Sequence, residues 1–406
     1  MRVPPLVEPG PPLTPEQVQR WSRHLLLPQV GELGQRRLAR ARVCVVGAGG
    51  LGAPVLQYLA AAGVGRLGIV DADDVELSNL QRQVLHGTAD VGRPKVDSAR
   101  DAMHALDPGV DVVLHRERLT ADNAHRLLAG YDLVVDGTDN FPTRYAVNDA
   151  CVRLGLPQVW GSVYRFDAQV AVFWGRPPAG LPAVQLRDLF PHPPAPGTVP
   201  SCAEGGVLGA LCGQVGSVMA TEAIKLVTGI GEPLLGRVLV LDALAARWTE
   251  VPLVGDRGRS DRAAADDATA GRRGPDAPGG GPAVGDDRRA VPDDGPAVPS
   301  VTARQLADRL AARDRGEDRF LLVDVREPGE RAVVAVPGAV NVPLGLILDG
   351  TTDLPRDVPL VLHCRAGTRS AQAGRALLLA GFGDVHHLEG GVLAWVADVD
   401  PSLPTY

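Results

Sequence analysis

The stretch that most limits how this chain can fold is residues 42–52. There an apolar run, RVCVV, leads through GAGGLG into a longer segment with helical spacing. A short continuous apolar run is typical of a strand buried on both faces, and glycines after it let the backbone turn sharply into a helix. Strand-like runs recur at 66–71, 110–117 and 131–137, and helix-like runs at 51–63 and 94–106. This alternation predicts an α/β fold with a parallel sheet covered by helices on both faces.

Composition divides the chain into two domains. Residues 255–300 contain no Leu, Ile, Met, Phe, Tyr or Trp. Such a segment cannot offset the entropy of ordering itself, so residues 254–298 are predicted to be a flexible linker. The linker separates a Rossmann-like doubly wound domain at 14–253 from a smaller α/β domain at 299–406. In the second domain, helix signals at 302–312 and 369–380 and strand signals at 320–325 and 359–364 repeat the pattern.

Charge, cysteines and hydropathy exclude several classes of protein. The net charge is −7, which argues against sequence-independent nucleic-acid binding. Five widely spaced cysteines and no apolar leader predict a cytoplasmic protein without a disulfide framework. The uncharged run 205–221 is shorter than the ~20 residues that span a bilayer, so it is predicted to be a buried helix.

The glycine-rich loop predicts a nucleotide site. Gly47, Gly49 and Gly52 fit G-x-G-x-x-G after a strand and before a helix, where free backbone N–H groups attract phosphate. Asp71 ends the next strand, where its carboxylate is placed for ribose hydroxyls. This pattern alone fits an NAD(P)-dependent oxidoreductase equally well.

Further polar residues favour a triphosphate over a dinucleotide. Arg82 and Lys95 follow the loop closely, and two extra cations suit the negative charge that builds on a departing pyrophosphate. Asn79 and Gln81 add neutral donors. Asp139, in the segment DGTDN after a later strand, is a candidate Mg²⁺ ligand.

Six segments together resemble the ubiquitin-activating-enzyme-like adenylyltransferases, and among them the molybdopterin-synthase adenylyltransferase group. They are RHLLLPQVGELGQRRL, GAGGLG, SNLQRQVLH, VGRPK, DGTDN and PSCAEGGVLG, within residues 14–253. The resemblance implies that ATP, with Mg²⁺, activates the C-terminal Gly-Gly carboxylate of a ubiquitin-fold sulfur carrier protein. The residues that it places around the nucleotide are Gly47, Gly49, Gly50, Gly52, Asp71, Ser78, Asn79, Leu80, Gln81, Arg82, Lys95, Asp139 and Asn140.

The same resemblance carries three further expectations. It implies a homodimer in which Arg23 reaches the ATP of the partner subunit. It marks Cys202 as the cysteine that bonds to the activated carrier. Many relatives hold a structural zinc on two C-x-x-C pairs, but this chain has no C-x-x-C, so no zinc site is predicted.

The second domain places a thiol in an anion-binding loop. Cys364 follows an apolar strand and precedes Arg365, Gly367 and Arg369, a setting of backbone N–H groups and cations that stabilises a thiolate or an anion. The spacing C-x4-R gives a smaller loop than the C-x5-R of cysteine phosphatases, which suits a terminal sulfur better than a phosphoryl group.

With DVREPGE and VPGAVNVPL upstream, residues 299–397 resemble a rhodanese, which implies that Cys364 carries persulfide sulfur. The combined prediction is an adenylyltransferase and sulfurtransferase that converts the carrier to its thiocarboxylate, as in molybdopterin, thiamine, cysteine or tRNA-thiolation pathways. The sulfur donor would be thiosulfate or a cysteine desulfurase. Three alternatives stay open: an NAD(P)-dependent oxidoreductase with a redox-thiol domain, a degenerate rhodanese used for docking, and a non-catalytic scaffold.

Overall fold

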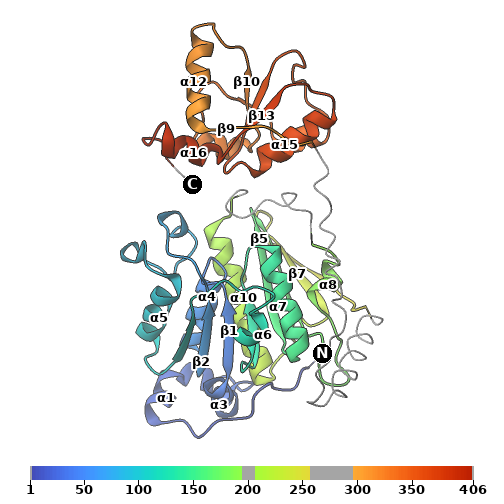
Figure 1. Cartoon of the computed structure of the whole chain (residues 1–406). Helices are drawn as coiled ribbons and strands as arrows, with labels where there is room; N and C mark the ends of the chain where they lie inside the picture. The colour runs from blue at the N-terminus through green and yellow to red at the C-terminus, as the bar shows by residue number, and fades with distance from the viewer. Residues whose placement is uncertain (1, 194–205, 257–295, 405–406) are drawn as a thin grey trace, which may run out of the picture. The chain divides into compact units, whose positions relative to one another are not determined.

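A computed structural model describes residues 2–193, 206–256 and 296–404 (Figure 1). These residues group into two compact units, one before and one after the predicted linker, and each is described by itself. Both units are α/β, as predicted. Most of the predicted linker at 254–298, and Cys202, lie outside the described residues. The domain boundaries therefore stay predictions.

The first unit is built on an eight-stranded sheet with the order β3-β2-β1-β4-β5-β6-β7-β8. The five strands that pair in parallel are β1 (Arg42–Val46), β2 (Arg66–Val70), β3 (Asp111–His115), β4 (Leu133–Asp136) and β5 (Gln158–Tyr164). From β1 the chain adds β2 and β3 on one side and then crosses back to add β4 and β5 on the other side. Such a switch point opens a crevice at the carboxyl ends of the strands, where α/β proteins bind ligands.

The rest of this sheet is antiparallel, which the alternating pattern did not predict. It consists of β6 (Asp167–Phe173), β7 (Arg237–Asp242) and β8 (Arg247–Pro252). All six residues of β8 are exposed, so this edge strand carries no burial pattern that would mark it in the sequence.

Helices cover both faces of the sheet. Cys44 and Val46 pack with residues of α6 (Ala124–Leu128) and α7 (Phe141–Leu154). The intervening Val45 points to the opposite face, toward the start of α4 (Gly52–Ala61). On that face α4 contacts α5 (Lys95–Leu106) and α10 (Gly209–Thr228), and α10 also contacts α3 (Gly31–Arg40). The described part of the unit also contains five short helical elements: α1 (Pro15–Arg20), α2 (Ser22–Leu25), η1 (Leu77–Asn79), η2 (Thr88–Asp90) and α8 (Leu186–Leu189).

Helix α10 confirms the prediction of a buried helix for residues 209–221 of the uncharged run, whereas residues 206–208 precede the helix and residue 205 lies outside the described residues. A side chain at Gly216 would lie 2.3 Å from Pro54 Cγ, so the small residues allow α10 to approach α4 closely. Among the described residues, none of the helices combines the length and the hydropathy that a membrane span requires.

The second unit contains a five-stranded parallel sheet with the order β11-β10-β12-β13-β9. Its strands are β9 (Ser300–Val301), β10 (Leu321–Asp324), β11 (Val340–Asn341), β12 (Leu360–His363) and β13 (Val385–Leu388). Alternate residues of β10 and β12 face opposite sides: Leu322 and Val361 pack in the cluster of α12 (Ala303–Asp314) and α16 (Gly391–Asp398). Val323 and Leu362 pack in the cluster of α14 (Leu344–Leu348) and α15 (Thr368–Leu379), which includes Cys364.

Candidate functional site

The glycine-rich loop lies at the carboxyl end of β1, at the switch point of the sheet. Gly47 has a φ of +90°, and a Cβ at Gly52 would lie 1.8 Å from the Gly47 carbonyl oxygen. A Cβ at Gly50 would lie 2.9 Å from Cys212 Sγ and 3.6 Å from Arg82 Cγ. Only glycine fits positions 47 and 52, and the backbone at Gly50 lies directly beside the arginine that the sequence predicted for phosphate binding.

Replacing Gly52 with alanine is expected to distort this loop. The new methyl group would collide with backbone rather than with a flexible side chain, so we expect local destabilisation of about 1–3 kcal/mol or more. Hydrogen exchange of peptides covering 42–56 measures it. Gly49→Ala is the matched control, because its Cβ would meet only Gln83 Nε2 at 3.6 Å and should leave exchange almost unchanged. Equal exchange in both variants would contradict the prediction.

The half-buried Asp71 and the buried His86 hold the backbone of Ala48 in this loop, one at its N–H and the other at its carbonyl. Asp71 Oδ2 accepts a hydrogen bond from the Ala48 N–H at 2.8 Å, and Asp71 Oδ1 accepts one from the Asp73 N–H at 2.9 Å. On the other side, His86 Nε2 lies 3.0 Å from the Ala48 carbonyl oxygen and His86 Nδ1 lies 2.8 Å from Ser98 Oγ. Asp71 therefore fixes the loop, in addition to any contact with ribose.

Burial shifts the pKa of both residues. Burial raises the pKa of Asp71, and the positive charge of Lys95 opposes the rise. Burial also lowers the pKa of His86, which favours a neutral ring at neutral pH. Since the Ala48 carbonyl can only accept, the proton of neutral His86 resides on Nε2. The sequence reasoning missed His86, although it closes the quoted segment SNLQRQVLH.

The predicted cations lie at the same edge. Lys95 is buried at the start of α5, and its Nζ lies 3.2 Å from Asp73 Oδ2. Arg82 Nη1 donates to the Ser78 carbonyl at 3.0 Å, and the buried Asn79 donates to Ser78 Oγ at 3.3 Å. Two other residues predicted in this segment are Leu80, which is half-buried, and Gln81, which is exposed. The start of α10 packs closely against this segment, because a Cβ at Gly209 would lie 2.2 Å from the Gln81 carbonyl oxygen. The structure thus brings the glycine loop, Arg82 and Lys95 together.

The loop after β4 completes this edge. A Cβ at Gly137 would lie 3.1 Å from the Gly52 nitrogen, so this loop and the glycine loop are in contact. Asp139 is exposed there, and Asn140 Oδ1 caps α7 by accepting from the Thr143 N–H at 3.0 Å. Asp139 is therefore placed as predicted, whereas the side-chain oxygen of Asn140 is engaged in capping a helix.

A buried network that the sequence reasoning missed holds the loop in place. Asp136 is fully buried and accepts from the Thr138 N–H, the Thr138 hydroxyl and Gln158 Nε2 at 3.0, 2.7 and 2.9 Å. Burial raises the pKa of Asp136. Arg144 donates to the Thr138 carbonyl from Nε and Nη2, at 3.1 and 2.9 Å. These side chains fix the turn that presents Asp139.

Arg23 does not join this group. Arg23 is exposed on α2. The next residue, His24, is hydrogen-bonded to Gln35, which donates to the carbonyl of Ala62. Ala62 follows the last residue of α4, whereas the glycine loop precedes the first, so α2 lies at the opposite end of α4 from this loop. A residue placed there is remote from the nucleotide loop of its own chain. Its action on a partner's ATP stays a proposal.

In the second unit, Cys364 lies at the carboxyl end of β12 with only 1% of its surface exposed. Its Sγ accepts from the Gly367 N–H at 3.1 Å, and the Ser370 hydroxyl lies 3.6 Å away. Gly367 has a φ of +98° and forms the N-cap of α15. The sulfur therefore faces backbone and hydroxyl donors of the first helical turn, as the loop pattern predicts.

The charges around this loop differ from the expectation of two cations that act together. Arg369 donates from both Nη atoms to the carboxylate of Glu330, at 2.7 and 2.8 Å, so its charge is matched. Arg326 likewise donates to Asp324 at 2.6 Å, and both are fully buried. Burial lowers the pKa of His363 to about 4, against the opposing charge of Asp324, so its ring is neutral at pH 7. Arg365 is half-buried.

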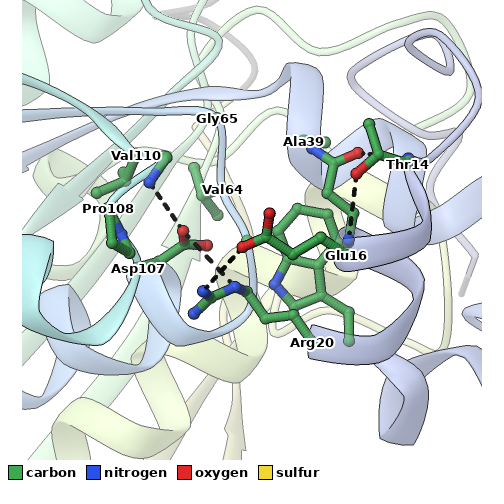
Figure 2. A pocket seen from close by; sticks show the side chains of 13 residues that line it. Thr14, Glu16, Arg20, Ala39, Val64, Gly65, Asp107, Pro108 and Val110 are labelled. Atoms are coloured by element: carbon green, nitrogen blue, oxygen red, sulfur yellow. Dashed lines mark hydrogen bonds and ion pairs between the residues drawn. The ribbon is translucent and has the colours of Figure 1, made fainter.

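The first unit also contains a pocket of about 410 Å³ whose lining includes none of the residues predicted for the nucleotide (Figure 2). It opens beside Gly65 and Val110, which precede β2 and β3, and thus at the amino edge of the sheet. Arg20 extends into it but is engaged by Glu16 at 3.6 Å, Asp107 at 3.9 Å and the Leu106 carbonyl. The pocket is therefore not part of the nucleotide edge.

Taken together, these features define a class: an enzyme that binds a nucleotide at a switch point and carries a thiol loop on a second domain. Residues 21–260 match the model of the ThiF family and residues 302–398 that of the rhodanese-like domain. The chain therefore belongs to the ThiF family and ends in a rhodanese-like domain. It is an adenylyltransferase and sulfurtransferase, and its family implies the use of ATP.

Three known proteins illustrate the relationship. The chain is 50% identical, over all of its own length and 99% of the relative's, to the probable adenylyltransferase/sulfurtransferase MoeZ of Mycobacterium tuberculosis. It is 57% identical to the sulfur carrier protein adenylyltransferase of Thermus thermophilus, over 59% of this chain and 88% of the relative. The crystal structure of MccB from E. coli with ATP shares the fold with a TM-score of 0.50 and 21% identity, over 59% of this chain and 72% of that chain.

Proposed function

We propose that the protein activates a ubiquitin-fold sulfur carrier protein at its C-terminal Gly-Gly and then converts it to the thiocarboxylate. The proposal rests mainly on the position of Arg82, Lys95 and the glycine loop at the same edge of the sheet. The same chain holds Cys364 in a loop where its sulfur accepts a hydrogen bond from a backbone N–H. The relative from Thermus thermophilus is named a sulfur carrier protein adenylyltransferase, which supports the adenylation step.

The first step is adenylation. The carrier carboxylate attacks the α-phosphorus of ATP, the bond to the β-phosphate oxygen breaks, and pyrophosphate leaves with the electron pair. Backbone N–H groups of the glycine loop hold the phosphates, and Arg82 and Lys95 stabilise the leaving charge. To reach the phosphates, Lys95 Nζ exchanges Asp73 for a phosphate oxygen.

The exposed Asp139 carboxylate fits an Mg²⁺ ion, because it stands at the edge of the glycine loop on a turn fixed by Asp136 and Arg144. Bound there, Mg²⁺ would neutralise phosphate charge. Asp139 would hold the ion, while the buried Asp136 positions the turn.

The second step is sulfur transfer. Cys364 carries a persulfide whose outer sulfur attacks the acyl carbon, AMP leaves, and an acyl disulfide forms. A second thiol then attacks the Cys364 sulfur, which releases the carrier thiocarboxylate and leaves a disulfide. Cys202 is proposed for this attack and lies outside the described residues.

The remaining expectations belong to the same proposal. The protein acts as a cytoplasmic homodimer in which Arg23 reaches the partner's ATP, holds no zinc and binds no nucleic acid. Thiosulfate or a cysteine desulfurase supplies the sulfur, and the pathway is of the molybdopterin, thiamine, cysteine or tRNA-thiolation type. The oxidoreductase alternative loses its support because the chain belongs to the ThiF family.

Exchange of labelled pyrophosphate into ATP tests the adenylation step. We expect exchange that requires both Mg²⁺ and a carrier with a free Gly-Gly terminus. A carrier whose last glycine is deleted is the matched control and should support none. NADH binding without carrier-dependent exchange would contradict the proposal.

A further inference from the structure

The carboxylate that pairs with Arg369 of the Cys364 loop comes from a distant part of the sequence. Glu330 lies on α13 (Pro328–Val333), 39 positions before Arg369. Its two carboxylate oxygens accept from the two Nη atoms of Arg369 at 2.7 and 2.8 Å. Both side chains are less than a tenth exposed, so water screens this pair weakly.

The other buried charges near the loop also balance. Asp324, which pairs with His363 in the register of β10 and β12, neutralises Arg326 at 2.6 Å. His363, directly before Cys364, is neutral at pH 7. Among the described residues of this unit, the four buried charged groups are thus two cations and two carboxylates. Arg369 therefore adds no net charge to the loop while Glu330 stays ionised.

We propose that Glu330 is a specificity-determining residue, which selects sulfur donors of low negative charge by neutralising Arg369. The inference rests on the proposed sulfur transfer at Cys364. Coulomb energy scales with the charge of the donor. A dianion therefore loses twice as much attraction to this loop as a monoanion when the charge of Arg369 is matched.

Two small donors isolate this effect because they differ by one unit of charge and transfer sulfur in the same way. They are thiosulfate, a dianion, and methanethiosulfonate, in which a methyl group replaces one anionic oxygen. In both cases the Cys364 thiolate attacks the outer sulfur, and the sulfur–sulfur bond of the donor breaks. Sulfite or methanesulfinate leaves with the electron pair, and Cys364–S–S⁻ remains. Added cyanide then takes the outer sulfur as thiocyanate and regenerates the thiolate.

The test measures thiocyanate formation by the full-length protein with each donor. The readout is the ratio of kcat/KM for thiosulfate to kcat/KM for methanethiosulfonate. This ratio does not depend on the folded fraction, since both donors meet the same preparation. We expect Glu330→Gln to raise it by about fivefold or more, and added salt to reduce the gain.

Three further variants separate charge from structure. Arg369→Gln alone should lower the ratio, and the double variant Glu330→Gln/Arg369→Gln should restore it to the wild-type value. Asp318→Asn, which releases Arg309 elsewhere in the same unit, should leave it unchanged.

An unchanged or lowered ratio in Glu330→Gln, or a raised ratio in the double variant, would overturn the inference while leaving sulfur transfer in place. No thiocyanate from either donor with the wild-type protein would overturn the proposed sulfur transfer itself, and the inference with it.

Discussion

Replacing Cys364 with alanine should abolish formation of the carrier thiocarboxylate and leave pyrophosphate exchange unchanged within about twofold. Cys364 is the sulfur that faces the Gly367 N–H, and the second domain offers the carrier no other described thiol. Adenylation uses groups of the first unit, which has its own core. The two activities should therefore separate cleanly in one variant, measured side by side with the same carrier.

The matched control for this variant is Cys151→Ala. Cys151 is buried in the core of the first unit, where burial raises the pKa of its thiol well above the usual range, so it is not a nucleophile at neutral pH. Its replacement should preserve thiocarboxylate formation. If Cys364→Ala still made thiocarboxylate at the wild-type rate, the assignment of the persulfide to Cys364 would be wrong.

Lys95→Ala should reduce pyrophosphate exchange by about 100- to 1,000-fold, the usual effect of removing a preorganised charge from a transition state. The side chain is 8% exposed and held at the nucleotide edge by Asp73, so its charge acts in a weakly screened environment. Most of the loss should appear in kcat rather than in the KM for ATP, because the charge on pyrophosphate grows as the bond breaks.

Arg100→Ala provides the control on the same helix. Arg100 pairs with Asp97 and Asp101 on the surface of α5, and its loss should change exchange by less than about twofold. A similar effect of both replacements would mean that Lys95 acts only by stabilising α5.

Local patterns in the sequence predicted those parts of the fold that local spacing determines. The run 42–52 predicted β1, the glycine loop and α4 because strand, turn and helix follow one another directly. The antiparallel strands β6 to β8 went unpredicted. Strands β7 and β8 form a local hairpin, but the pairing of β6 with β7 joins segments far apart in the chain. The exposed β8 adds no alternation of buried and exposed residues.

In the candidate site, too, the sequence predicted the residues that stand in local motifs but not those that act through long-range contacts. Glycines, Arg82, Lys95 and Cys364 stand in recognisable segments and were predicted. The residues that hold them were not: His86 contacts a carbonyl 38 positions away, and Glu330 contacts Arg369 across 39 positions. A buried polar residue looks like any surface residue in a single sequence, so its partner is found only once the fold is known.

The most direct test of the central claim is the intact mass of the carrier after incubation with the protein, ATP, Mg²⁺ and thiosulfate. The account predicts a mass increase that corresponds to one sulfur replacing one oxygen at the terminal glycine, dependent on ATP and absent with Cys364→Ala. A carrier of unchanged mass, under conditions in which pyrophosphate exchange is measured, would contradict it.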